Sequence, residues 1–133
     1  MKNITLKQEK EILRISPLNH TWIIDFDGTL VEHNGYKTGE DKFLAGAKEF
    51  LQSIPEDDFI LIMTAREKEA REKTETFLKD NGIRYNEILF EMPMGERILI
   101  NDTKPSGLKC AYAIAPERNQ GLQNIKMIID EEL

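Results

Sequence analysis

The segment at residues 21–30 (Thr-Trp-Ile-Ile-Asp-Phe-Asp-Gly-Thr-Leu) most constrains the fold, because its apolar run ends abruptly in two aspartates and a glycine. A short run of this kind predicts a buried strand. Residues i and i+2 lie on the same side of a strand, so we expect Asp25 and Asp27 to face one pocket. Gly28 permits a sharp turn beside a ligand, and Thr29 adds a hydroxyl after it. The alternative is a solvated Asp-Gly turn at a strand end.

Two further apolar runs end in the same way. Residues 59–63 are followed by Thr64, Ala65 and Arg66, and residues 97–100 are followed by Asn101 and Asp102. Runs that are apolar throughout are typical of buried parallel strands. Because the carboxyl ends of parallel strands meet at one edge of a sheet, we expect the polar residues after the three runs to share one site.

The rest of the chain predicts helices and turns between strands. We expect a polar helix over residues 5–14, a Gly-rich flap over 31–40, helices over 41–53 and 66–80, the second capped by Asn81 and Gly82, a short strand over 87–90, a turn at 105–107, a strand around Cys110, and a final helix carrying Leu122, Ile125 and Ile128. Strands that alternate with helices predict a right-handed three-layer α/β/α sandwich with a central parallel sheet.

Composition is consistent with one domain over residues 1–133. The 18 basic and 24 acidic residues give a net charge of -6, which argues against a broad nucleic-acid or anionic-membrane surface. The first residues lack the apolar core of a signal peptide and no apolar run is long enough to span a bilayer, so we expect a cytoplasmic protein. Cys110 is the single cysteine, which excludes an intrachain disulfide and favours a buried, inert thiol.

Residues 25–30 (Asp-Phe-Asp-Gly-Thr-Leu) resemble the first motif of the haloacid dehalogenase-like phosphatase superfamily, Asp-x-Asp-Gly-Thr after a strand. Thr64 fits the second motif, a Thr or Ser after a strand, and Asp102 fits the acidic fourth motif. The resemblance covers residues 22–115, in the motif order of the family. It implies a Rossmann-like sandwich.

The intervals in which this superfamily carries substrate-covering cap domains are short here. The chain therefore resembles a capless member with an open site. We expect a large substrate, a partner subunit in a homo-oligomer, or the flap around His33, Asn34 and Tyr36 to exclude water from that site.

The resemblance implies phosphoryl transfer through an aspartyl phosphate. Asp25 would attack phosphorus, and Asp27 would protonate the leaving oxygen and later accept a proton from water. Both acids and the phosphate are negative, so the resemblance also implies Mg²⁺ as cofactor, with Asp25, the backbone carbonyl of Asp27, and Asp102 as ligands.

The remaining implied site residues would hold the substrate phosphate. Thr64 would donate its hydroxyl to a phosphate oxygen, and Gly28, Thr29 and Ala65 would lie around the group. Thr64 and Glu67 also form a Thr-x-x-Glu capping box, which alone explains the residue. Arg66 either binds a second anionic group of the substrate or lies solvated on the first helical turn.

The chain departs from the family at the third motif, which is a lysine, often in a Lys-Pro pair. The corresponding pair here is Met92-Pro93, and no lysine occurs between Asp80 and Arg97. Lys104, two residues after Asp102, is the nearest basic replacement and a candidate catalytic residue. Arg97 is the less favoured replacement, because it starts the strand that Asp102 follows.

Three functions remain open from the sequence. The leading hypothesis is a Mg²⁺-dependent phosphomonoesterase acting on a phosphorylated sugar or similar small metabolite. The second is a phosphate-ligand binding or regulatory domain that lost turnover, which Met92 favours. The third is a nucleotidase or polynucleotide end phosphatase, which the acidic charge disfavours.

Overall fold

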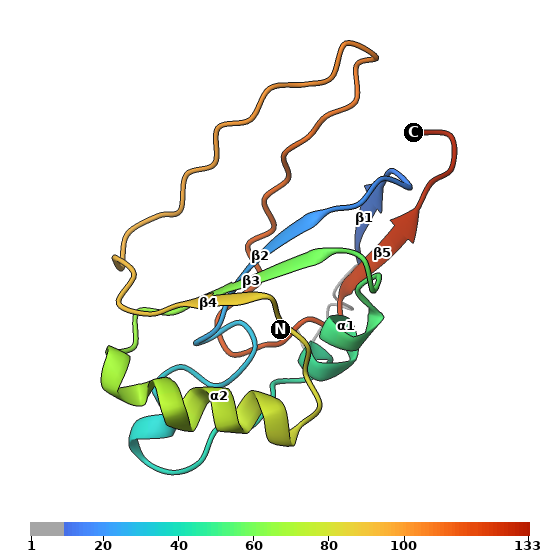
Figure 1. The fold of residues 1–133 in the computed structure, drawn as a ribbon. Helices are drawn as coiled ribbons and strands as arrows, with labels where there is room; N and C mark the ends of the chain where they lie inside the picture. Colours follow the sequence, from blue (N-terminus) through green and yellow to red (C-terminus); the bar gives the residue numbers. More distant parts are fainter. Residues whose placement is uncertain (1–9) are drawn as a thin grey trace, which may run out of the picture.

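The computed structural model describes residues 10–133 and has a mixed α/β fold with two parallel sheets (Figure 1). Its strands are β1 (Glu11–Ile15), β2 (Thr21–Asp25), β3 (Phe59–Met63), β4 (Glu87–Leu89) and β5 (Ile125–Ile129). Its helices are α1 (Ala47–Ser53) and α2 (Arg71–Asp80), with 3-10 turns η1 (Gly35–Lys37) and η2 (Lys68–Ala70).

The larger sheet has the order β2-β3-β4, and all three strands are parallel. The register pairs Thr21 with Phe59 and Asp25 with Met63, so β2 and β3 end at the same edge. The three predicted strands in this part of the chain, and their parallel arrangement, are confirmed.

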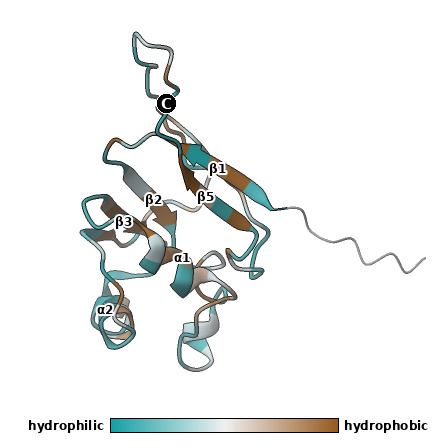
Figure 2. Ribbon diagram, turned by 90° about the vertical axis from the view of Figure 1, so that its right-hand side faces the viewer, coloured by the Kyte–Doolittle hydropathy of each residue, from teal (hydrophilic) through white to brown (hydrophobic). Residues whose placement is uncertain are grey.

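Helices cover one face of this sheet. Both α1 and α2 lie on the same side of the strands (Figures 1 and 2). The side chains that alternate toward them are buried, among them Ile24, Ile62 and Ile88. On the opposite face Ile23 and Phe59 are 48% and 46% exposed. Within residues 10–133, the predicted three-layer sandwich is therefore confirmed only as a mixed α/β fold with parallel sheets.

The smaller sheet corrects two predictions. β1 and β5 pair in parallel, with Glu11 opposite Ile125. The final helix predicted around Leu122 and Ile125 is wrong, because this segment leads into β5. The helix predicted over 5–14 is wrong from residue 11 onward, where the chain forms β1, and residues 5–9 lie outside the described residues. In β1 exposed and buried residues alternate, which is strand periodicity. The β-branched residues of β5 likewise favour a strand once a partner is present.

Both predicted long helices start later than expected. The helix expected from residue 41 begins at Ala47, because Phe43 forms a bridge with Val31 and Leu44 N–H donates to Leu30 O. The helix expected from residue 66 begins as η2 and becomes α-helical at Arg71. Its end at Asn81 is confirmed. Neither α-helix is long and apolar enough to cross a membrane.

Residues 95–116, which we call the arm, contain no helix or strand. Figure 1 shows the arm in orange, extending away from the β2-β3-β4 sheet and then returning toward it. Its tip is the predicted turn, in which Gly107 N–H donates to Lys104 O. The strands predicted at 97–100 and around Cys110 are wrong. An apolar run becomes a strand only with a partner, and here Ile98 and Ile100 are 83% and 92% exposed.

Candidate active site

The two aspartates of the first motif lie at the carboxyl end of β2. The Asp25 side chain is 35% exposed, and each of its oxygens has a partner. Thr29 Oγ1 donates to Oδ2 at 2.9 Å, and Arg97 Nη1 donates to Oδ1 at 3.0 Å. Asp25 is therefore an accessible carboxylate beside a hydroxyl and a positive charge.

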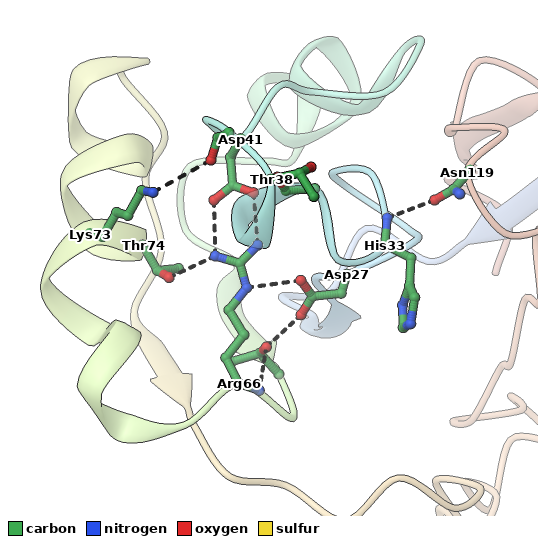
Figure 3. Close-up of polar contacts among 11 residues, drawn as sticks. Asp27, His33, Thr38, Asp41, Arg66, Lys73, Thr74 and Asn119 are labelled. Carbon is green, nitrogen blue, oxygen red and sulfur yellow. Dashed lines mark hydrogen bonds and ion pairs between the residues drawn. The ribbon is translucent and has the colours of Figure 1, made fainter.

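Asp27 is more enclosed, and residues after β3 hold it. Thr64 Oγ1 donates to Asp27 Oδ2 at 2.6 Å, and Arg66 Nε donates to Oδ1 at 2.8 Å (Figure 3). The backbone N–H of Arg66 also donates to Thr64 Oγ1. The predicted meeting of polar residues at the ends of the first two apolar runs is present, and its physical cause is the shared edge of two parallel strands.

Arg66 is a buried side chain with an exposed fraction of 3%. Its two Nη atoms donate to the two oxygens of Asp41 at 2.9 and 2.8 Å, and Nη1 also donates to Thr74 Oγ1 at 2.9 Å. Burial alone lowers the pKa of this guanidinium, but the hydrogen bonds to Asp41 and the charge of Asp27 outweigh burial and raise the pKa. The solvated alternative for Arg66 is wrong.

The turn after Asp27 is tight. The carbonyl of Phe26 accepts hydrogen bonds from the N–H groups of Leu30 and Val31, and Gly28 N–H donates to Val31 O. Gly28 has φ of +85°, and a Cβ there would lie 3.2 Å from Cγ of Arg118. The positive φ favours glycine here, and a Cβ would also crowd the Arg118 side chain.

A segment near the carboxyl terminus, around Asn119, is hydrogen-bonded to this turn. Asn119 N–H donates to Gly28 O, and the Asn119 side-chain oxygen accepts from His33 N–H at 2.8 Å (Figure 3). Nδ1 of His33 is enclosed and has no hydrogen-bond partner among the described residues. The flap and the segment around Asn119 are thus joined to the loop that carries the acids.

Thr64 does not cap a helix. Its hydroxyl accepts from Arg66 N–H and donates to Asp27, while the turn η2 begins only at Lys68 and α2 only at Arg71. The capping-box explanation of this residue is wrong. Ala65, between the two anchoring residues, is exposed beside the site.

The structure brings together some of the predicted site residues and leaves others apart. Asp102 and Lys104 lie exposed on the arm, and within residues 10–133 neither forms a hydrogen bond or ion pair with Asp25 or Asp27. Residues 10–133 contain no group of three or more His, Cys, Asp or Glu side chains placed to hold a metal ion. Arg97, the less favoured replacement for the third-motif lysine, is the one that contacts Asp25.

Met92 occupies the place expected for the third motif. Its backbone N–H donates to Thr64 O at 3.0 Å, so the residue lies against the loop after β3. A lysine at this position would start its side chain beside the site, whereas methionine brings no charge. Among residues 10–133, the positive group in contact with Asp25 is therefore the Arg97 guanidinium.

Sequence reasoning missed Asp41 and Thr74 as partners of the site, and it placed Tyr36 in the flap without foreseeing its contact with Arg66. Asp41 was interpreted as the start of a helix, yet its carboxylate is 2% exposed and paired with Arg66. The arginine head group lies 3.8 Å from the ring centroid of Tyr36. The available signal was Tyr36 in the flap and Asp41 directly after it, since an aromatic residue and an acid suit an arginine after the neighbouring strand.

Two hollows lie beside the flap and α2 rather than at the acids. The smaller, about 220 Å³, is lined by Glu32, Gly35, Thr38, Gly39, Glu40, Asp41 and Lys42. The larger, about 540 Å³, lies between Asp41 and the α2 residues Lys73 and Thr76. Asp41 lines both hollows and contacts Arg66, so its carboxylate connects this flank to the acid pair. Neither hollow is lined by Asp25 or Asp27.

The geometry defines a small carboxylate site with two unequal acids. Asp25 is accessible and lies next to a cationic side chain, which suits attack on an anionic centre. Asp27 is fixed in orientation by a hydroxyl and a guanidinium, which suits directed proton transfer. Comparison of the chain with models of protein families, with curated protein sequences and with solved structures finds no match.

Proposed function

We propose that the chain is a phosphomonoesterase of the haloacid dehalogenase-like type. The observation that carries the proposal is the pair Asp25 and Asp27 at the end of β2, with Thr64 of the next parallel strand hydrogen-bonded to the second acid. The residue types and spacing of the first two motifs, and their places at the ends of β2 and β3, support the proposal, whereas Asp102 follows no strand. We further propose a cytoplasmic enzyme that acts on a phosphorylated sugar or a similar small metabolite.

In this proposal the two acids divide the work by their surroundings. A carboxylate oxygen of Asp25 forms a bond to phosphorus while the bond from phosphorus to the ester oxygen breaks. Asp27 gives its proton to the departing oxygen, then takes one from the water that hydrolyses the aspartyl phosphate. Its two hydrogen-bond donors keep the carboxylate aimed during both steps.

We propose Mg²⁺ as the cofactor, since carboxylate and carbonyl oxygens are its preferred ligands. The chain offers the right atoms in the Asp25 carboxylate and the Asp27 carbonyl, and Mg²⁺ commonly keeps several waters. Asp102, the third ligand implied by the resemblance, lies on the arm. When bound, the ion would offset the negative charge that gathers during phosphoryl transfer.

We propose Arg97 as the replacement for the missing third-motif lysine, because it is the cation that contacts Asp25. Asp102 lies five residues further on, and an extended chain rises about 3.3 Å per residue, so the two are roughly 17 Å apart while this segment stays extended. Arg97 and Asp102 therefore cannot both reach Asp25 in that state. We therefore propose two arrangements of the arm. In the first, Arg97 contacts Asp25, as in the structure; in the second, Asp102 reaches the site instead.

The second arrangement would also complete the sheet. Phe59 N–H donates to His20 O and Phe26 N–H donates to Met63 O, so by alternation the polar backbone groups of Ile23 point away from β3. No strand within residues 10–133 pairs with that edge. We propose that residues 97–100 add there as a further strand of the sheet, and that the complete fold is the three-layer sandwich.

Two variants separate these arrangements. If Arg97 serves the reaction, Arg97→Gln lowers kcat/KM by about 10²-fold or more, as loss of a charge-stabilising group does, while the Mg²⁺ requirement stays unchanged. If Asp102 is a ligand, Asp102→Asn instead raises the Mg²⁺ concentration needed for half-maximal activity. If both variants keep full activity, neither residue belongs to the site.

Phosphate release tests the proposed function. Wild type and Asp25→Asn would be assayed with sugar phosphates, nucleotides, 5′-phosphorylated oligonucleotides and p-nitrophenyl phosphate, with Mg²⁺ and with chelator. We expect turnover that requires both Mg²⁺ and Asp25. Asp57→Asn, a change at an exposed aspartate beyond the other end of the sheet, is the matched control and keeps full activity. Turnover on oligonucleotides alone would favour an end phosphatase.

A phosphate-ligand binding domain is the second candidate, and Met92 is the observation that favours it. The backbone of Met92 is bonded to the loop after β3, where its uncharged side chain replaces a lysine. That function predicts no turnover with any ester, together with binding of inorganic phosphate that Asp25→Asn changes in isothermal calorimetry.

A further inference from the structure

The side chain with the most polar contacts near the acid pair belongs to Arg66. A guanidinium has five N–H donors, and four hydrogen bonds join the head group of Arg66 to Asp27, Asp41 and Thr74. Its flat head group lies between two rings, 3.8 Å from the centroid of Tyr36 and 4.7 Å from that of Phe26. This side chain is therefore committed to contacts inside the protein.

These contacts come from three separate parts of the fold. Asp27 belongs to the loop after β2, Tyr36 and Asp41 belong to the flap region, and Thr74 belongs to α2 (Figure 3). Arg66 itself follows β3. Because one rigid planar group joins all of them, a shift of the flap or of α2 moves the atom that holds Asp27.

Within residues 10–133, the hydrogen bonds to the Asp27 carboxylate come from residues 64 and 66. Thr64 holds one carboxylate oxygen and Arg66 holds the other, while the Arg66 backbone N–H fixes the hydroxyl of Thr64. Arg66 thus fixes Asp27 both directly and through Thr64. A lysine could keep the charge but could not make the forked contact with Asp41 and reach Asp27 as well.

We infer that Arg66 is a positioning residue, which aims the carboxyl of Asp27 at the departing oxygen and links that aim to the flap through Asp41 and Tyr36. This inference rests on the proposed phosphatase activity. It assigns Arg66 a different role from a direct contact with a second anionic group of the substrate, because four of its five donors are occupied within the protein and the side chain is buried.

The test uses two substrates that differ in their need for a proton. Nitrophenolate leaves without protonation at neutral pH, whereas the alkoxide of a sugar phosphate needs the proton that Asp27 gives. The readout is kcat/KM, which reports the steps through formation of the aspartyl phosphate and leaves out its hydrolysis, a step common to both substrates. In Arg66→Lys we expect kcat/KM for the best sugar phosphate to fall by about tenfold or more, because general acid catalysis contributes at least that much. We expect kcat/KM for p-nitrophenyl phosphate to stay within about threefold of wild type.

A matched control is Arg84→Lys. Arg84 also joins loops, by hydrogen bonds to the carbonyls of Asp58 and Pro55, but at the opposite end of β3. It should alter both substrates equally, if at all. Thermal unfolding followed by circular dichroism checks that each variant folds. If Arg66→Lys does not fold, Asp41→Asn and Tyr36→Leu must show the same difference between the two substrates.

The outcomes separate the inference from the function beneath it. Equal losses on both substrates would reduce Arg66 to a structural role and overturn the inference. A large rise in KM with unchanged kcat would show that Arg66 binds substrate, which also overturns it. Absence of Asp25-dependent turnover in wild type would overturn the proposed function, and the inference would fall with it.

Discussion

The sheet that carries the acid pair and the arm at residues 95–116 show opposite relations between sequence and structure. Both contain apolar runs that end in polar residues. In β2 and β3 the run has a parallel partner on its edge and helices on one face, so its end becomes a defined site. In the arm the run at 97–100 has neither, and its isoleucines stay exposed. The end of an apolar run therefore becomes a defined site only when the run pairs with a neighbouring strand and packs against helices.

The two arginines that contact the acid pair give the largest expected difference. Arg66→Met removes a buried cation and leaves Asp27 and Asp41 enclosed without compensation, so we expect a loss of about 3–5 kcal/mol in the free energy of unfolding. Arg97→Met at the base of the arm breaks an exposed ion pair and should cost less than about 1 kcal/mol. Urea denaturation measures both. Similar losses would contradict the contrast between the two regions.

Paired isoleucine truncations sharpen the comparison. Ile60 in β3 is fully buried and Ile100 in the arm is 92% exposed. Ile60→Ala should cost about 2–4 kcal/mol, because it leaves a cavity in the core. Ile100→Ala should stay within about 0.5 kcal/mol. A cost above about 1 kcal/mol for Ile100→Ala would instead show that the arm packs on β2 in solution, as the second arrangement requires.

The contrast explains which parts of the fold the sequence could predict. β2, β3 and β4 were predictable because each is a short apolar run that ends at polar or turn residues, and each pairs with a strand next to it along the chain. β1 and β5 were not, because Leu122 and Ile125 also match helical spacing, and only pairing between the two ends of the chain makes that segment a strand. Long-range pairing of this kind leaves no local signal.

The candidate site divides in the same way. Asp25, Asp27 and Thr64 could be placed together because each lies at or just beyond the end of a strand of one sheet. The roles of Asp41 and Tyr36 could not, because the flap folds onto Arg66 through contacts that depend on the whole fold. Arg97 was judged remote on the assumption of a strand at 97–100, and without that strand it reaches Asp25.

Two glycines with similar backbone conformations test how tightly each region is packed. Gly121 has φ of +82°, and a Cβ there would collide with the backbone of Ala45. Gly107 at the tip of the arm has φ of +94°, with open space around it. Gly121→Ala should cost about 3 kcal/mol from overpacking, and Gly107→Ala about 1 kcal/mol from the backbone alone. Thermal unfolding compares them, and equal shifts in Tm would show that the arm tip is also packed.

The smallest expected effect is a pH dependence that belongs to the sheet region alone. Burial of Asp58 raises its pKa. Hydrogen bonds from the Trp22 indole and from the backbone and ring of His20 lower the pKa by more than burial raises it, so the pKa lies below the ordinary value. A lowered pKa in the folded state means that this stabilisation is complete above the unfolded value, near pH 4, and is lost as pH falls through the folded value.

Asp58→Asn should therefore destabilise the protein at pH 7, and the difference from wild type should shrink as pH falls below about 4. Denaturant unfolding followed by Trp22 fluorescence at pH 7, 5, 4 and 3 measures this difference. Trp22 is the single tryptophan and donates to Asp58, so its signal reports on this end of the sheet rather than on the arm. A difference that stays constant from pH 7 to 3 would mean that the negative charge of Asp58 does not stabilise the fold. The stabilisation would then come from the hydrogen bonds of the side chain irrespective of its charge.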